Sequence, residues 1–341
     1  MEKEKAPKKR SRKEIDDHFA AHMPGVLSYH QTMLADGLRN KLLFKAIKQT
    51  VKPGMSFLDI GAGTGVWAVL AAKLGASRVV AIEIEECLIP VIYKHAQENG
   101  VADRIEIIHA NSNDVNLKGK FDVIVSELFG GDALGAETVR SFVNLRTRFL
   151  APGGILIPQK LEMFAAPVHL KNSVHDIPAG LPFSTNFLRS LRLNYALHLP
   201  ISERDRVSFL ADPKRLIALD FHHDTDPPSL ENLKTSWNVK NLKKANAIVT
   251  FNRSTFTDNI TMDAFGSQSW GVGVNEFTPF AGKSGEIAFR LTLDSKQGNW
   301  SVALPSDPTQ PQQNYGPVFA FARMRMAQKM TPHRRVKPKA K

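Results

Sequence analysis

The residues best suited to chemistry surround a glycine-rich turn between a predicted strand and a predicted helix. Gly61, Gly63 and Gly65 form the turn, Asp59 precedes it, and Glu83 ends the next apolar segment. Glycines without a Cβ let the backbone turn sharply and let a ligand approach closely. Open α/β sheets bind ligands at the carboxyl ends of their strands, where both acids are expected. The pattern therefore predicts a ligand site formed by the turn and the two carboxylates.

The spacing of the glycines indicates which ligand this site takes. A dinucleotide fingerprint needs Gly-x-Gly-x-x-Gly, but its sixth position is Val66 here. Asp59 would repel a pyrophosphate, whereas it suits an ammonium or sulfonium group. Glu83 can accept hydrogen bonds from both hydroxyls of a ribose. These features favour S-adenosylmethionine over NAD as cofactor, whereas a glycine turn without a ligand would leave both acids unexplained.

The surrounding pattern predicts the elements that position these residues. A helical pattern runs to about residue 49, and apolar strands then alternate with helices up to residue 158, which is typical of a parallel sheet covered on both faces. Beyond it, short alternating segments separated by Pro and Gly turns favour antiparallel strands, with one helical stretch at 185–193. We therefore predict an α/β protein with a Rossmann-like parallel sheet, followed by an antiparallel β domain. The predicted divisions are a basic tail (1–13), a cofactor-binding domain with N-terminal helices (14–158), a β-rich domain (159–304), and a linker with a basic tail (305–341).

The charge is concentrated at the two ends of the 341-residue chain. The net charge is +12, and residues 1–13 hold seven basic and two acidic residues, while residues 323–341 hold eight basic and no acidic residues. The intervening chain is close to neutral, which argues against a basic nucleic-acid groove within the fold. The tails could bind RNA, DNA or an acidic partner, or could serve only solubility and non-specific tethering.

Other features limit the compartment and the chemistry. The single cysteine, Cys87, excludes an intramolecular disulfide and a thiolate-only metal site. No apolar run approaches the ~18 residues of a membrane span, and the charged N-terminus does not resemble a presequence. We expect a cytoplasmic protein without membrane contact, or a nuclear one if the basic run 7–13 acts as an address in a eukaryote. The segment 222–226 contains two adjacent histidines, but a solvated turn explains them better than a metal site, and no metal is predicted.

Several motifs resemble the protein arginine methyltransferase family. The helix before the first strand carries Met33-Leu34-Ala35-Asp36-Gly37-Leu38-Arg39, similar to the family's Met-Leu-x-Asp-x-x-Arg. The fourth strand leads into Ser126-Glu127, which opens a loop that ends at Glu137, and segments 149–158 and 211–214 also resemble family sequence. The resemblance covers about residues 17–304 and leaves out both tails. It implies a Rossmann-like class I methyltransferase sheet, followed by an antiparallel, barrel-like β domain for substrate binding and dimerisation.

The resemblance implies roles for individual residues. Arg39 would bind the methionine carboxylate of the cofactor, and Glu127 and Glu137 would be the catalytic pair that grips the substrate guanidinium, with Glu127 also beside the cofactor. Two carboxylates can hold a guanidinium bidentately and turn one of its nitrogens toward the methyl group. Ser112 and Asn113 stand where the family has its adenine-contacting acid, and Met33 and Trp270 would bind the substrate.

The chain also departs from the family pattern. The loop glutamates are ten positions apart, one more than usual, so Asp132 is an alternative to Glu137. The family's Thr-His-Trp motif reads Gln268-Ser269-Trp270, without the His that pairs with the helix Asp. These departures leave the product type open between symmetric and asymmetric dimethylarginine.

Three functions follow from the sequence. The first is methylation of arginine in basic proteins, the second is methylation of another acceptor such as RNA or a small molecule, and the third is a weakly active or non-catalytic subunit of a heteromer. Family members form head-to-tail dimers through an arm of the β domain. The resemblance therefore implies a homodimer, with residues 170–200 as the candidate arm.

Overall fold

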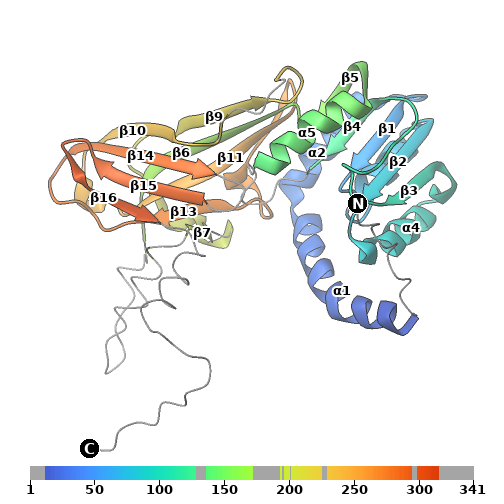
Figure 1. Cartoon of the computed structure of the whole chain (residues 1–341), viewed down its shortest axis with the longest axis horizontal. Helices are drawn as coiled ribbons and strands as arrows, with labels where there is room; N and C mark the ends of the chain where they lie inside the picture. Colours follow the sequence, from blue (N-terminus) through green and yellow to red (C-terminus); the bar gives the residue numbers. More distant parts are fainter. Residues whose placement is uncertain are drawn as a thin grey trace, which may run out of the picture.

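The chain folds into two domains joined end to end (Figure 1). The computed structural model describes residues 12–127, 136–171, 193, 196–199, 201–224, 229–293 and 298–314. Most of the predicted helix at 185–193, most of the candidate dimer arm, residues 1–11 of the N-terminal tail and the whole basic segment 323–341 lie outside these residues. A parallel sheet with helices forms one domain, and antiparallel sheets form the other, so the predicted fold class is confirmed.

Two helices precede the first strand, within the predicted helical pattern that runs to about residue 49. Helix α1 spans Arg12–Ala35 and α2 spans Gly37–Thr50. The break lies at Asp36, whose backbone is not helical (φ −74°, ψ 86°) and whose carboxylate accepts a hydrogen bond from the backbone N–H of Arg39. A short acidic side chain at this position satisfies one of the free amides of the new helix, which is why α2 starts here.

The first domain is a five-stranded parallel sheet in the order β3-β2-β1-β4-β5. The chain order reverses at β1, which lies between β2 and β4, and open α/β sheets bind ligands at such a reversal. Helices α3, α4 and α5 connect the strands and cover the sheet (Figure 1). The elements are β1 (Ser56–Ile60), α3 (Val66–Lys73), β2 (Arg78–Glu83), η1 (Glu86–Leu88), α4 (Ile89–Glu98), η2 (Ala102–Arg104), β3 (Ile105–His109), β4 (Phe121–Ser126), α5 (Ala136–Phe149) and β5 (Leu150–Ile157).

The second domain is built around the long strands β6 and β11, which pair antiparallel. Strands β7, β13, β8, β12 and β9 extend their sheet, and β10-β14-β15-β16 form a second sheet. The bounds are β6 (Lys160–Leu170), β7 (Ala196–Leu199), η3 (Ile201–Arg206), β8 (Val207–Phe209), β9 (Lys214–Asp220), β10 (Leu233–Val239), η4 (Leu242–Lys244), β11 (Ala247–Thr257), β12 (Ile260–Asp263), η5 (Ala264–Gly266), β13 (Val272–Glu276), β14 (Gly285–Leu293), β15 (Gly298–Leu304) and β16 (Asp307–Asn314).

The last strand corrects the predicted linker. Residues 307–314, which contain two prolines and three glutamines, form β16 at the edge of the second sheet and pair with β15. The prediction failed because the segment has no apolar pattern. An edge strand needs only one side of its backbone to pair, so it tolerates proline.

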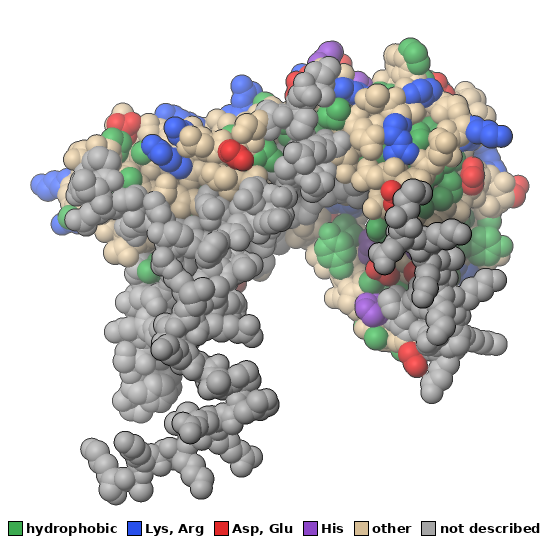
Figure 2. Space-filling view, viewed as in Figure 1, with side chains coloured by type: hydrophobic (Ala, Val, Ile, Leu, Met, Phe, Trp, Pro, Cys, Tyr) green, Lys and Arg blue, Asp and Glu red, His purple; other side chains and the backbone are tan. Residues whose placement is uncertain are grey.

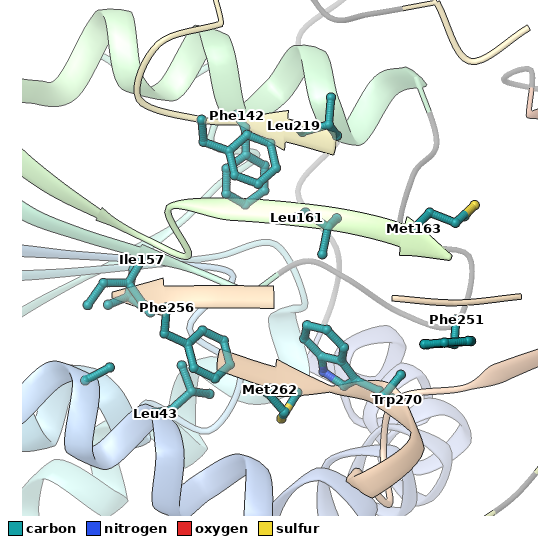
Figure 3. Close-up of a cluster of buried hydrophobic side chains, with 14 of the residues drawn as sticks. Leu43, Phe142, Ile157, Leu161, Met163, Leu219, Phe251, Phe256, Met262 and Trp270 are labelled. Carbon is teal, nitrogen blue, oxygen red and sulfur yellow. The ribbon is translucent and has the colours of Figure 1, made fainter. Parts of the chain in front are cut away.

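An apolar interface holds the two domains together (Figure 3). Leu43 of α2 and Ile157 of β5 lie in the same buried cluster as Phe256 and Met262 of the β domain. Phe142 of α5 stacks on Phe221 just after β9, with ring centroids 4.5 Å apart. Because these buried side chains are closely packed, they fix the position of one domain relative to the other.

On the face shown in Figure 2, the Lys and Arg side chains of the described residues are scattered over both domains. None of the described helices is long and apolar enough to cross a bilayer.

Candidate active site

A pocket of about 510 Å³ lies at the carboxyl ends of β1, β2 and β4. Its walls come from α1, the start of α2, the glycine turn after β1, the end of β2 and Glu127 after β4. This volume is typical of a site for a small molecule or cofactor. The pocket thus lies where the order of strands predicts a ligand site.

The glycine turn forms the floor of the pocket. Gly61, Gly63 and Gly65 have φ values of 68°, 57° and 78°, in the left-handed region that side chains disfavour. A Cβ on Gly63 would lie 2.8 Å from Cε1 of His30, and a Cβ on Gly65 would lie 2.7 Å from Ile92. The turn therefore requires glycine for its backbone conformation and also for its close packing.

Glu83 is fixed in position by backbone amides. Its side chain is buried, and its carboxylate accepts hydrogen bonds from the N–H groups of Gly63 (2.7 Å), Ile84 (2.8 Å) and Glu85 (2.8 Å). These contacts tie the end of β2 to the glycine turn. They hold the carboxylate in the pocket wall with its remaining lone pairs available to ligand hydroxyls.

Asp59 is a buried carboxylate at the end of β1 with only one hydrogen-bond partner described, the N–H of Ala68 at 3.0 Å. Burial, reinforced by the nearby charge of Glu83, raises its pKa to about 7. A carboxylate in this position binds a cationic ligand strongly because little water competes with it.

Arg39 and Glu127 form a buried, bidentate ion pair. Nε of Arg39 donates to Oε1 of Glu127 at 2.6 Å, and Nη2 donates to Oε2. The indole Nε1 of Trp270 donates to the same Oε1 at 2.8 Å. Burial lowers the pKa of Arg39 to about 10, which leaves it charged at neutral pH. Glu127 is therefore already oriented to hold a planar guanidinium through both of its oxygens.

The loop that lacks the expected His binds Asp36 with serine hydroxyls instead. The Asp36 carboxylate accepts hydrogen bonds from Oγ of Ser267 (2.5 Å) and from both N (2.9 Å) and Oγ (2.8 Å) of Ser269. Burial by itself would raise the pKa of Asp36, but these bonds and that from Arg39 N–H lower it. The contact between the helix Asp and the β domain is therefore kept without a titratable partner.

The structure brings most of the predicted site residues together. The lining of the pocket includes seven of them, and Trp270 reaches it through Glu127; the seven are Met33, Arg39, Asp59, Gly61, Gly63, Glu83 and Glu127. Gly65 lies just beneath, at the start of α3. Glu137 belongs to α5, but its side chain and Asp132 lie outside the described residues.

Ser112 and Asn113 lie outside the lining of the pocket. The carbonyl of Ser112 accepts a hydrogen bond from Nη1 of Arg148, and Oδ1 of Asn113 accepts one from Nδ2 of Asn144. Both residues are thus bound to the α5 side of the sheet. The structure places Ile84 and Glu85, directly after β2, in the pocket instead.

Several lining residues were not among the predicted site residues. His30 and Tyr29 come from α1, and Asn40 and Trp67 come from α2 and α3. The helical spacing of Tyr29, His30 and Met33 is a signal for the first two, but it equally fits an amphipathic helix without a ligand. Nothing local in the sequence marks Asn40, whose Oδ1 accepts a hydrogen bond from Nη1 of Arg39 at 2.8 Å.

The two adjacent histidines, His222 and His223, lie in a turn just after β9. Nε2 of His222 accepts a hydrogen bond from the N–H of Leu156 at 3.2 Å, so this ring connects the β domain to β5. No group of three or more His, Cys, Asp or Glu that could hold a metal ion occurs among the residues that the structure describes.

Comparison with known proteins finds similarity to methyltransferases. A family model described as ribosomal protein L11 methyltransferase (PrmA) matches residues 40–159. The chain is 30% identical over 171 residues to protein arginine N-methyltransferase 6 of Danio rerio, covering 50% of this chain and 49% of the relative. It is 30% identical over 200 residues to PRMT10 of Oryza sativa subsp. japonica, covering 55% and 51%. The chain thus spans about half the length of these curated relatives.

Solved structures resemble nearly the whole described fold. A Trypanosoma brucei PRMT1 enzyme–prozyme heterotetrameric complex with AdoHcy gives a TM-score of 0.70 at 18% identity, over 84% of this chain and 96% of that chain. The Arabidopsis thaliana protein arginine methyltransferase 10 gives 0.66 at 19% identity, over 85% and 99%. The resemblance to protein arginine methyltransferases is confirmed. The two-domain fold is the fold of these arginine methyltransferases.

Proposed function

We propose that the protein is an S-adenosylmethionine-dependent methyltransferase that modifies arginine side chains of basic proteins. The observation that carries the proposal is the Glu127 carboxylate, which holds a guanidinium bidentately at the edge of the pocket. That guanidinium is the side chain of Arg39, and a substrate arginine would need a carboxylate with the same bidentate geometry.

The pocket residues fit the proposed cofactor. Glu83 suits the ribose hydroxyls, Asp59 suits the cationic part of the methionine moiety, and Arg39 suits its carboxylate. When bound, S-adenosylmethionine supplies an electrophilic methyl group on a sulfonium. Because this transfer is a direct displacement, the protein mainly orients the two reactants and stabilises charge.

The proposed reaction needs Arg39 to change partners. Arg39 would turn from Glu127 to the carboxylate of the cofactor, and the substrate guanidinium would replace it on Glu127. Trp270 would keep Oε1 of Glu127 in place throughout, because its indole N–H donates to that oxygen. The second carboxylate of the grip, Glu137 or Asp132, stays a prediction.

The Asp36 network favours an active enzyme over a non-catalytic subunit. The serine hydroxyls restore the link between α2 and the β domain that the absent His would make. A homodimer is part of the proposal, supported by the resemblance alone; light scattering that shows a monomer would refute it. The proposed location is cytoplasmic, and no described basic groove supports a nucleic-acid acceptor.

The test is transfer of labelled methyl groups from S-adenosylmethionine to an arginine-rich peptide and to a cell extract, followed by acid hydrolysis. We expect label in methylarginine, and its position on the guanidinium identifies the product type. Glu127→Gln should lower transfer by about 10²–10³-fold with cofactor affinity retained. Glu162→Gln is the matched control, because Glu162 pairs with Arg215 on the β domain, away from the pocket. Label only in nucleic acid or small molecules would refute the proposal.

A further inference from the structure

Arg204 is a buried cation of the β domain that does not line the pocket. It lies in η3 and is 9% exposed. Its Nε has no hydrogen-bond partner among the described residues. A buried guanidinium with an unpaired N–H costs stability, so its place here calls for a reason other than stability.

The guanidinium of Arg204 binds both ends of one short segment, residues 264–270. Nη1 donates to the carbonyl of Ala264, and Nη2 donates to the carbonyl of Trp270 at 2.6 Å. Between these ends, its Cζ lies 5.9 Å from the centroid of the Phe265 ring. The planar fork therefore sets the distance between the two ends of the segment.

Asp36 holds the same segment from the other side. Its carboxylate takes hydrogen bonds from the hydroxyls and amide of Ser267 and Ser269. Burial lowers the pKa of Arg204, and the charges of Asp36 and Asp263 offset part of that effect. The segment 264–270 is thus bound by Arg204 through its backbone carbonyls and by Asp36 through its hydroxyl and amide donors. The opposite charges of Arg204 and Asp36 stabilise each other.

The segment ends at the residue that contacts Glu127. Trp270 gives its backbone carbonyl to Arg204 and its indole N–H to Glu127. We infer that Arg204 is a positioning residue for the proposed arginine methyl transfer, acting through Trp270 on the carboxylate of Glu127. This role rests on the proposed function. It concerns the orientation of the substrate, since Arg204 contacts neither the glycine turn nor Glu83.

The role of Arg204 predicts a selective kinetic defect. Arg204→Lys keeps the charge but cannot span both carbonyls, and Arg204→Met removes both contacts. A displacement of Glu127 by about 1 Å should lower kcat for an arginine peptide about 100-fold. The cofactor dissociation constant should change less than about threefold, since the glycine turn, Asp59 and Glu83 are untouched.

Arg146→Met is the matched control. Nη1 of Arg146 also donates to a backbone carbonyl, that of Phe221 at 2.7 Å, but between α5 and the residue just after β9. We expect this variant to lose stability and to keep kcat. Equal kcat in Arg204→Lys, Arg146→Met and the wild type would overturn the inference.

Trp270→Phe tests the route through the indole. If Arg204 acts through Trp270, the kcat of the double variant Arg204→Lys/Trp270→Phe should equal the kcat of the less active single variant. A double variant whose loss of kcat is the product of the two single losses would overturn that route. Should Arg204→Met fail to fold, Arg204→Lys with Trp270→Phe decides the question. A wild-type protein that binds the cofactor but methylates no arginine would refute the proposed function, whereas an active wild type with unaffected Arg204 variants refutes only the inference about Arg204.

Discussion

Replacing Asp59 with Asn should stabilise the protein at high pH and weaken its cofactor site. The pKa of this buried carboxyl is raised from 3.8 to about 7. A group with a raised folded-state pKa favours folding when protonated, so its contribution is lost as pH rises from about 4 to 7. From this pKa shift, ionised Asp59 lowers the free energy of unfolding by up to about 4 kcal/mol. Asn is neutral at every pH and still accepts the Ala68 N–H, so it avoids this loss.

The assay is thermal unfolding of the wild type and Asp59→Asn at pH 5 and pH 9. For a domain of this size, about 2–4 kcal/mol is equivalent to about 5–15 °C in Tm. We expect the variant to exceed the wild type by this amount at pH 9, and by much less at pH 5. An equal difference at both pH values would refute the burial argument.

Asp122→Asn is the control with the opposite sign. This carboxylate accepts hydrogen bonds from N and Oγ of Ser56, both at 2.8 Å, and these bonds lower its pKa. A lowered pKa stabilises the folded state above about pH 4. The variant should therefore be less stable than the wild type at pH 7, by about 1 kcal/mol.

The same carboxyl predicts the pH dependence of cofactor binding. A cationic ligand favours ionised Asp59, so affinity for S-adenosylmethionine should fall as pH drops below about 7, up to about tenfold per pH unit. Calorimetric titration measures this, and Asp59→Asn should bind weakly with little pH dependence. If the affinity of the wild type does not change between pH 5 and pH 8, the role of Asp59 is contradicted.

Two further predictions concern the turn and the domain interface. Gly63→Ala should abolish measurable cofactor binding because its Cβ would lie 2.8 Å from Cε1 of His30, whereas Gly54→Ala, with φ also positive but nothing within 4 Å, should retain binding in the same titration. Burial lowers the pKa of His222, whose Nε2 accepts the Leu156 N–H, so the stability of the protein should fall as pH drops through 6.5. His222→Gln should make Tm depend less on pH in this range. An unchanged pH profile of Tm in the variant would refute the role of His222.

The sequence predicted the elements around the cofactor pocket well. Asp59 and Glu83 were found from position alone, because strands of one parallel sheet present their carboxyl ends at the same edge. The contact of Ser112 and Asn113 with the cofactor stays a prediction. Their hydrogen bonds to α5 side chains more than 30 positions away could not be predicted from the local sequence.

What the sequence by itself determined is the set of local conformations: the alternation of strands and helices, the glycine turn with its positive φ values, and the two acids at strand ends. Only the tertiary structure decided which distant groups share a carboxylate. Arg39 and Trp270 lie 88 and 143 positions from Glu127, and Ser267 lies 231 positions from Asp36. These contacts exist because an apolar interface docks the β domain against α2 and α5, and no local pattern encodes the register of two packed surfaces.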